Sequence, residues 1–210
     1  MATIVLSPTT ATIPTQTAVR LRCPACRANG SFEPIIPNDV RAVSGETLGV
    51  RKCPHPKCGA LVFFILQKDS TFVSYPAERI DFDTSGIPTS VHDAFEEAIT
   101  CHSDECYVAS AIMVRKTLEL ICHDRGATGA NLKERLAALK GKVILPQELF
   151  DGLDDLRLLG NDAAHVESQI FDQVGKQEAE VGIELTKEIL KAAYQYSSLL
   201  SKLRALKKVP

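Results

Sequence analysis

Two pairs of cysteines in the first third of the chain constrain its fold most strongly. The pairs are Cys23-Pro-Ala-Cys26 and Cys53-Pro-His-Pro-Lys-Cys58, and Gly59 follows the second. Each pair contains proline and lies beside a strand-like segment, which is typical of the two knuckles of a zinc ribbon. Four thiolates bind Zn2+ tetrahedrally in a closed shell. We predict structural zinc at Cys23, Cys26, Cys53 and Cys58, with His55 as an alternative ligand and unliganded surface thiols as the competing interpretation.

The pattern of apolar residues changes along the chain and predicts an α+β protein. Residues 1–18 are rich in threonine, and we interpret them as an N-terminal tail or an edge strand. Residues 19–87 form the predicted zinc ribbon and linker; the linker contains Pro76 and Gly86, and Pro88 follows it. Its predicted strands are Val19–Arg22, Thr47–Arg51, Ala60–Leu66 and Thr71–Tyr75. Residues 88–210 have the three- and four-residue spacing of an all-α helical bundle.

The helical part divides at its capping residues, prolines and glycines. We expect helices from Ser90 to about Thr100, from Ser103 to Asp124, from Asn131 to Lys140, onward from Pro146, and from about Gly175 to Lys207. The last would be roughly 45 Å long. Its apolar stripe exceeds what the shorter helices can cover, so we predict a homodimer through the helical half. The stripe is Leu185, Ile189, Ala193, Tyr196, Leu200 and Leu203.

The charged residues are unevenly distributed. The net charge is −2, which argues against a protein that coats nucleic acid with its whole surface. Residues 20–57, however, hold seven Lys and Arg side chains against three acidic ones, so this strip is a candidate for binding RNA or DNA. The seven are Arg20, Arg22, Arg27, Arg41, Arg51, Lys52 and Lys57.

The sequence also predicts a cytoplasmic protein with no membrane association. We find no export signal at Met1–Leu6, and the longest apolar run, Gly59–Leu66, is far too short to span a bilayer. Cysteines in that compartment are mostly thiols or metal ligands. We interpret the remaining three, Cys101, Cys106 and Cys122, as small core or surface residues.

One polar stretch in the helical half is a second candidate site. Arg157, Asn161 and His165 are spaced four residues apart, so they share a helical face if the helix continues. Gly160, Ala163 and Ala164 lie between them and allow another backbone to approach closely. Arg115 and Glu119 would border the same cluster. The alternative is a helix end at which Asn161 caps and His165 bonds to the backbone.

The order of these motifs resembles a family of uncharacterised prokaryotic domains. The residues that carry the resemblance are the cysteine pairs, Tyr75-Pro76, Glu97-Ala98, Arg115-x-x-Leu118-Glu119, Leu132 and Arg157-x-x-Gly160-Asn161-x-Ala163-Ala164-His165. They resemble the domain of unknown function four-one-four-five. The resemblance implies a bundle related to the HEPN domains of toxin–antitoxin, restriction and abortive-infection systems. Those domains are often homodimers, and many are metal-independent ribonucleases.

The catalytic motif of HEPN ribonucleases is only partly matched. That motif is Arg-Asn-x-x-x-His, and here Asn161 and His165 match while Gly160 replaces the arginine. The nearest arginine is Arg157, about one helical turn away. In a ribonuclease, His165 would move protons, Arg157 would stabilise charge on the phosphate, and Asn161 would orient one of them. We favour a non-catalytic defence or stress module that binds nucleic acid or a protein partner, with an endoribonuclease as the alternative.

Overall fold

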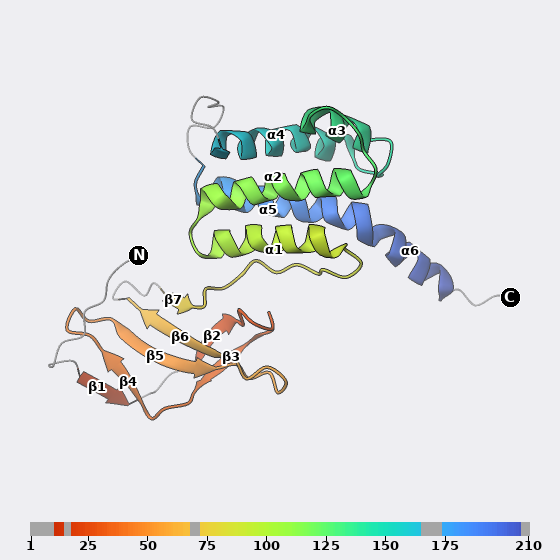
Figure 1. Cartoon of the computed structure of the whole chain (residues 1–210). Helices are drawn as coiled ribbons and strands as arrows, with labels where there is room; N and C mark the ends of the chain where they lie inside the picture. Colours follow the sequence, from red (N-terminus) through yellow and green to blue (C-terminus); the bar gives the residue numbers. More distant parts are fainter. Residues whose placement is uncertain (1–10, 15–17, 68–71, 165–173, 207–210) are drawn as a thin grey trace. The chain divides into compact units, whose positions relative to one another are not determined.

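The computed structural model describes residues 11–14, 18–67, 72–164 and 174–206. The chain divides into two compact units, Met1–Asp81 and Phe82–Pro210, which we call the sheet unit and the helical unit. The fold class is α+β, with an antiparallel sheet followed by helices (Figure 1). Within the described residues, no helix is both long and apolar enough to cross a membrane.

The sheet unit is a curved antiparallel sheet in which β5 is the central strand. Its order is β1-β4-β5-β3-β2, and β6 pairs with both β5 and β7. The longest pairing runs from Thr47 opposite Leu66 to Lys52 opposite Leu61. The strands are β1 (Ala11–Pro14), β2 (Val19–Arg22), β3 (Asn29–Pro34), β4 (Asn38–Arg41), β5 (Thr47–Lys52), β6 (Leu61–Leu66) and β7 (Phe72–Tyr75).

Alternation along the strands decides which side chains are buried. Successive residues of a strand point to opposite faces, so in β6 Val62 and Phe64 are buried while Leu61 and Phe63 are exposed. Val62 joins Leu21 and Phe32 in a core cluster that also contains two of the predicted metal ligands, Cys23 and Cys53. The apolar core therefore reaches the cysteine pairs.

The helical unit is arranged around α2. The elements are α1 (Thr89–Ser103), α2 (Tyr107–Asp124), α3 (Leu132–Leu139), α4 (Gln147–Ala164), α5 (Lys176–Leu190), a π-helical turn (Lys191–Gln195) and α6 (Tyr196–Ala205). The predicted stripe of α2 is buried at Ala111, Val114, Leu118 and Ile121. Through these side chains α2 contacts α1, α3, α4 and α5. Phe82 packs edge-to-face on Phe95 of α1, with ring centroids 5.0 Å apart, so the last linker residues group with the helices.

Three helix boundaries differ from the predicted ones. Ser103 does not cap α2: it belongs to α1, and its hydroxyl donates to the carbonyl of Thr100. The α2 helix begins only at Tyr107, after a turn in which Glu105 has a φ of 62°. The predicted last helix is interrupted by the π-helical turn. Pro146 immediately precedes α4, and its carbonyl accepts from the amides of Leu149 and Phe150.

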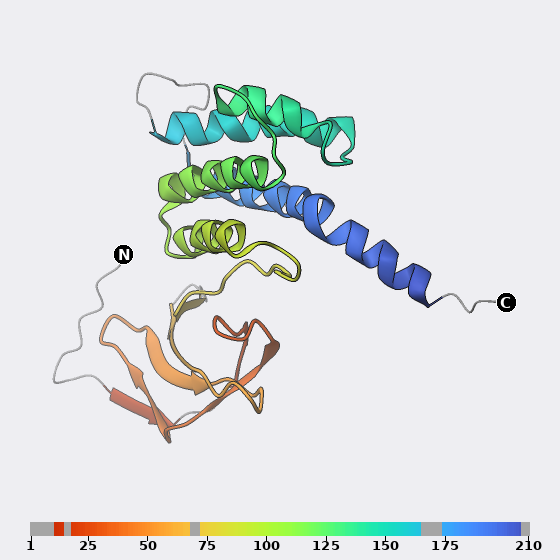
Figure 2. The ribbon, with the colours of Figure 1, turned by 45° about the vertical axis from the view of Figure 1, so that its right-hand side comes forward.

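The last segment, α6, runs beyond the other helices of its unit (Figures 1 and 2). None of its residues is buried, although Ile189 and Ala193, in the first part of the predicted stripe, are. The large apolar side chains of α6 that are exposed are Tyr196, Leu199, Leu200 and Leu203, and Leu206 follows them. The predicted excess of apolar surface is therefore located on α6.

Candidate metal centre and surrounding surfaces

The four cysteines of the two pairs meet in the sheet unit. Their sulfur atoms all lie within 4.8 Å of one another. The Sγ atoms of Cys23 and Cys58 are 3.8 Å apart, and those of Cys26 and Cys53 are 3.7 Å apart. Tetrahedral sulfurs that each lie about 2.3 Å from a central zinc ion would be separated by about 3.8 Å. The donor set and its spacing therefore fit a tetrahedral, thiophilic metal ion.

Two tight turns hold the sulfurs in place, and they resemble each other. In the first, the amide of Arg27 donates to the carbonyl of Cys23; in the second, the amides of Cys58 and Gly59 donate to the carbonyl of His55. Each pair is followed by a residue with a φ of 61°, Arg27 after Cys26 and Gly59 after Cys58. Glycine adopts that conformation easily, whereas an arginine is uncommon there. The sequence indicated this role for Gly59 but gave no signal for Arg27.

The thiols differ in how readily they lose a proton. Burial raises the pKa of Cys53 to about 12. Burial also acts on Cys23, but hydrogen bonds from the backbone of Cys26 and Ala25 outweigh it and lower the pKa of that thiol. Cysteine binds a metal as thiolate, so a bound cation would displace protons from the more basic thiols.

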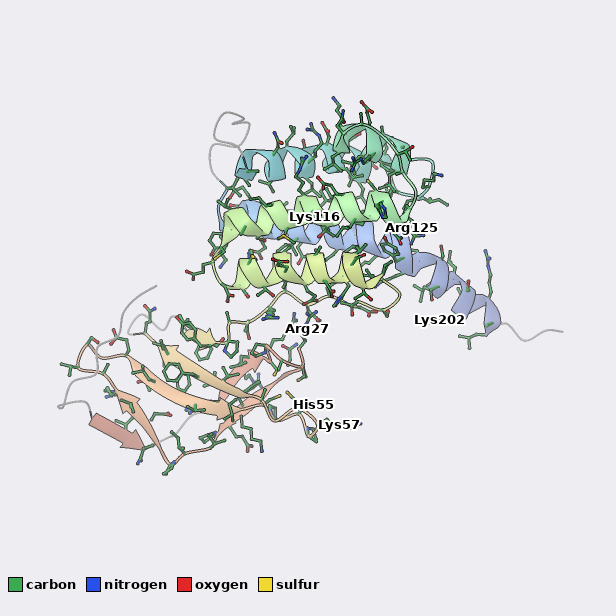
Figure 3. The ribbon with its side chains drawn as sticks, viewed as in Figure 1. Arg27, His55, Lys57, Lys116, Arg125 and Lys202 are labelled. Atoms are coloured by element: carbon green, nitrogen blue, oxygen red, sulfur yellow. The ribbon has the colours of Figure 1, made fainter. Side chains whose placement is uncertain are left out.

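His55 is not part of the sulfur cluster. The group of side chains close enough to share a metal ion consists of the four cysteines, and no second such group exists among the described residues. The His55 side chain is exposed. Figure 3 places it beside Lys57 on the second knuckle. Four sulfurs complete a tetrahedral site without a histidine.

An exposed face of the sheet carries two aromatic rings. Phe63 of β6 lies opposite Tyr75 of β7, and their ring centroids are 6.5 Å apart. Phe63 is 39% exposed and Tyr75 is 40% exposed. Leu61 points to the same face two residues earlier, where it lies opposite Lys52 of β5. We call Lys52, Leu61, Phe63 and Tyr75 the exposed sheet face.

A basic hollow of about 550 Å³ lies along β2 and β3. Arg20, Arg22 and Arg79 line it together with Ser31 and the acidic Glu78. Arg20 and Ser31 are partners across the two strands. The charge of Arg22 is partly offset by Asp81, whose carboxylate lies 3.9 Å from its guanidinium.

Arg51 is buried and cannot contact RNA or DNA, so its inclusion in the predicted basic strip of residues 20–57 is wrong. Its side chain is only 1% exposed and makes a two-pronged ion pair with Asp39, with N–O distances of 2.9 and 2.7 Å. The guanidinium also lies over the ring of Phe64, 4.5 Å from its centroid. The reason is its position in β5, where alternation directs residue 51 into the core beside Val62.

The polar stretch of α4 is only partly described. His165 lies outside the described residues, while Arg157 and Asn161 are half-buried on α4. The Nε of Arg157 donates to the carboxylate of Asp154 at 2.7 Å, not to Glu119, and this bond lowers the pKa of Asp154. Arg115 pairs with Glu119 at 3.5 Å and donates to the main-chain carbonyl of Arg157 at 3.2 Å.

Gly160 brings α2 and α4 into close contact at this polar stretch. It is buried, and a Cβ added to it would lie 2.5 Å from the Cβ of Arg115 and 3.1 Å from the carbonyl oxygen of Ala111. A residue with a side chain would therefore clash with α2. Gly160 therefore serves the packing of α4 on α2.

The sheet with its four-cysteine centre and the α2-centred bundle define a two-unit α+β protein of the kind that the motif order predicted. A family model described as "Domain of unknown function (DUF4145)" matches residues 96–208. The chain belongs to this family, which confirms the predicted resemblance. No curated protein and no solved structure matches the chain.

Proposed function

We propose that the protein is a non-catalytic interaction module that binds single-stranded nucleic acid through a zinc-stabilised sheet unit. The observation that carries the proposal is the exposed aromatic pair of Phe63 and Tyr75 on a sheet face that also carries Lys52. Its setting in a prokaryotic defence or stress system follows from the resemblance of the family to HEPN bundles. The helical unit is, in this proposal, a scaffold for assembly.

Zinc is the metal that we assign to the cysteine centre. Cys23, Cys26, Cys53 and Cys58 would hold it, and four thiolates leave no position for water or substrate. The metal would therefore stabilise the fold without taking part in a reaction. Because Cys23 and Cys53 also belong to the core cluster, the ion would fix the end of the sheet to which the basic knuckle residues are attached.

The exposed sheet face has the properties of a stacking platform. Nucleic-acid bases stack on aromatic side chains irrespective of sequence, and nearby cations contact the backbone phosphates. Phe63 and Tyr75 offer two rings on adjacent strands, and Lys52 of β5 lies two residue pairs away along the ladder, opposite Leu61. Six of the seven predicted basic residues remain candidates for phosphate contacts once the buried Arg51 is set aside, and Arg20 and Arg22 line the basic hollow.

The alternative of a ribonuclease receives less support from the polar stretch. A working site needs a proton-transfer group and a charge stabiliser that converge on one phosphate. The Arg157 guanidinium is bound to Asp154, and Gly160 is in contact with Arg115. A phosphate would have to compete with the Asp154 carboxylate for the arginine.

The binding test uses fluorescence anisotropy with a labelled single-stranded oligouridine RNA and the full chain. We expect binding that weakens steeply with salt. Stacking contributes roughly 1–3 kcal/mol per base, so the double variant Phe63→Ser/Tyr75→Ser should bind about tenfold more weakly or worse. The matched control is Val43→Ser, an exposed apolar residue of the same unit that lies outside the exposed sheet face.

Two outcomes would replace this function. Equal binding by the parent and the double variant would exclude the exposed sheet face as the binding surface. No binding at all would favour a protein partner. Incubation with total RNA in EDTA tests the ribonuclease separately. Cleavage by the parent protein that a His165→Ala variant loses would make the protein an enzyme.

A further inference from the structure

The apolar face of α6 is largely exposed, although Leu199 lines a hollow together with Asp83, Ser85 and Gly86 of the same unit. Leu199 is 64% exposed and Leu203 is 60% exposed. The main contact of α6 is with the π-helical turn that precedes it. A ten-residue helix with so few packing contacts is marginal in water, so these leucines need a larger apolar surface.

A groove between α4 and α5 offers an apolar surface of suitable size. A hollow of about 350 Å³ lies between the two helices, and a second of about 500 Å³, lined by α5 residues, adjoins it at Val181 and Leu185. Leu156 and Leu159 of α4 form its floor, and Val181 at its edge is 59% exposed. At this floor α5 lies close to α4, since a Cβ added to Gly182 would be 3.3 Å from the side chain of Leu159.

The charges of the groove and of α6 are opposite. Glu180, Glu184 and Glu188 line the α5 side of the groove. The α6 helix contains Lys202 and Arg204 and no acidic residue. Glu184 and Glu188 bind Lys187 and Lys191 of their own helix, at 2.9 and 2.7 Å, so Glu180 is the rim carboxylate best placed for a partner.

We propose that α6 of one copy of this chain docks in the α4–α5 groove of a second copy, and that the two copies exchange this contact around a twofold axis. Such reciprocal contacts close into a dimer. The α6 helix cannot use the groove of its own chain without reversing direction, because it runs on from α5 past the bundle (Figures 1 and 2).

The positions of the apolar residues support an antiparallel arrangement. Leu185 and Leu199 lie seven residues on either side of Ala192, and Val181 and Leu203 lie eleven residues on either side. Seven and eleven residues are about two and three helical turns. Two antiparallel copies that cross at the π-helical turn therefore bring Val181 level with Leu203, and Glu180 level with Arg204 of the other copy.

The test is the mass of the full chain by light scattering at micromolar concentration, with circular dichroism to verify folding. We expect the parent to be a dimer and Leu199→Glu/Leu203→Glu to be a folded monomer. Val181→Glu, on the groove side, should also give a monomer. Ile144→Glu is the matched control, because Ile144 is 95% exposed and belongs to neither surface.

A charge exchange tests the orientation of the two copies. Glu180→Arg and Arg204→Glu should each weaken the dimer several-fold, and combining them should restore it. A monomeric parent, or a dimer that survives Leu199→Glu/Leu203→Glu, would overturn the proposal. If both single changes weaken the dimer and the double exchange does not restore it, Glu180 does not pair with Arg204 and the antiparallel arrangement is excluded.

Discussion

Arg51 and Asp39 show how one ion pair can fix the centre of a curved sheet. Asp39 comes from β4 and Arg51 from β5, and both are almost fully buried. Gly49 makes the room for them, since a Cβ there would lie 2.1 Å from the carboxylate of Asp39 and 2.9 Å from the guanidinium of Arg51. A buried charge without its partner is strongly destabilising, whereas an apolar pair of similar volume can replace a buried ion pair at little cost.

We predict that Arg51→Ala lowers the free energy of unfolding of the sheet unit by about 3–5 kcal/mol, because it leaves the Asp39 carboxylate buried and unpaired. The double variant Arg51→Met/Asp39→Leu should regain most of this loss. Urea unfolding of the two variants beside the parent measures both quantities. A single variant no less stable than the double one would show that the pair is not the important contact.

Gly160 allows α2 and α4 to pack closely, as Gly49 makes room for the buried ion pair in the sheet. Glycine in a helix interior normally costs about 1 kcal/mol relative to alanine, so replacing it by alanine usually stabilises a helix. At Gly160 the added methyl group would meet the Cβ of Arg115 and the carbonyl of Ala111. The steric conflict involves backbone, which a side-chain rotation cannot relieve.

Gly160→Ala should therefore destabilise the helical unit by about 1–3 kcal/mol, as overpacking typically does. Thermal unfolding followed at 222 nm provides the measurement. Gly141→Ala is the control, because its added Cβ would be 3.8 Å from the nearest atom, an ordinary contact. Equal midpoints for Gly160→Ala and the parent would mean that the helices separate easily at this point.

Periodicity and spacing predicted the elements better than their ends. The α2 helix followed from apolar residues that repeat at three- and four-residue steps, and the metal centre followed from two cysteine pairs with short internal spacing. Both signals are local in the sequence. The positive φ of Arg27 and the burial of Arg51 depend on neighbours that the fold supplies. The Arg157–Asp154 bond, in contrast, joins residues three apart on one helix, a spacing that is visible in the sequence. The π-helical turn at Lys191–Gln195 adds a residue within a pattern that otherwise continues, so no local signal indicated it.

At the scale of the whole molecule, the predicted metal belongs to one unit only. All four cysteines of the centre lie before Asp81, whereas Cys101, Cys106 and Cys122 lie in the helical unit. Burial raises the pKa of Cys122 to about 11, which keeps it a protonated core residue at neutral pH. Metal binding and helix packing are thus assigned to different parts of the chain.

We predict one zinc ion per chain, and we expect a strong chelator to unfold the sheet unit while the helical unit stays folded. Elemental analysis gives the stoichiometry, and amide NMR spectra before and after chelation report on each unit. Cys53→Ser should lose the metal, while Cys106→Ser, at an exposed cysteine of the helical unit, should keep it. Less than half a zinc ion per unchelated chain would contradict the assignment.

The π-helical turn determines the side of the helix on which the residues after it lie. A π turn accommodates one more residue than the α-helix around it, and one residue corresponds to about 100° of rotation. Deletion of a single residue at Lys191–Gln195 would therefore restore a continuous α-helix and leave Tyr196, Leu200 and Leu203 on the side that they occupy now. If the same residues were wound as a continuous α-helix without a deletion, the leucines would instead lie about 100° further around the helix, so the direction in which they are presented depends on the π turn.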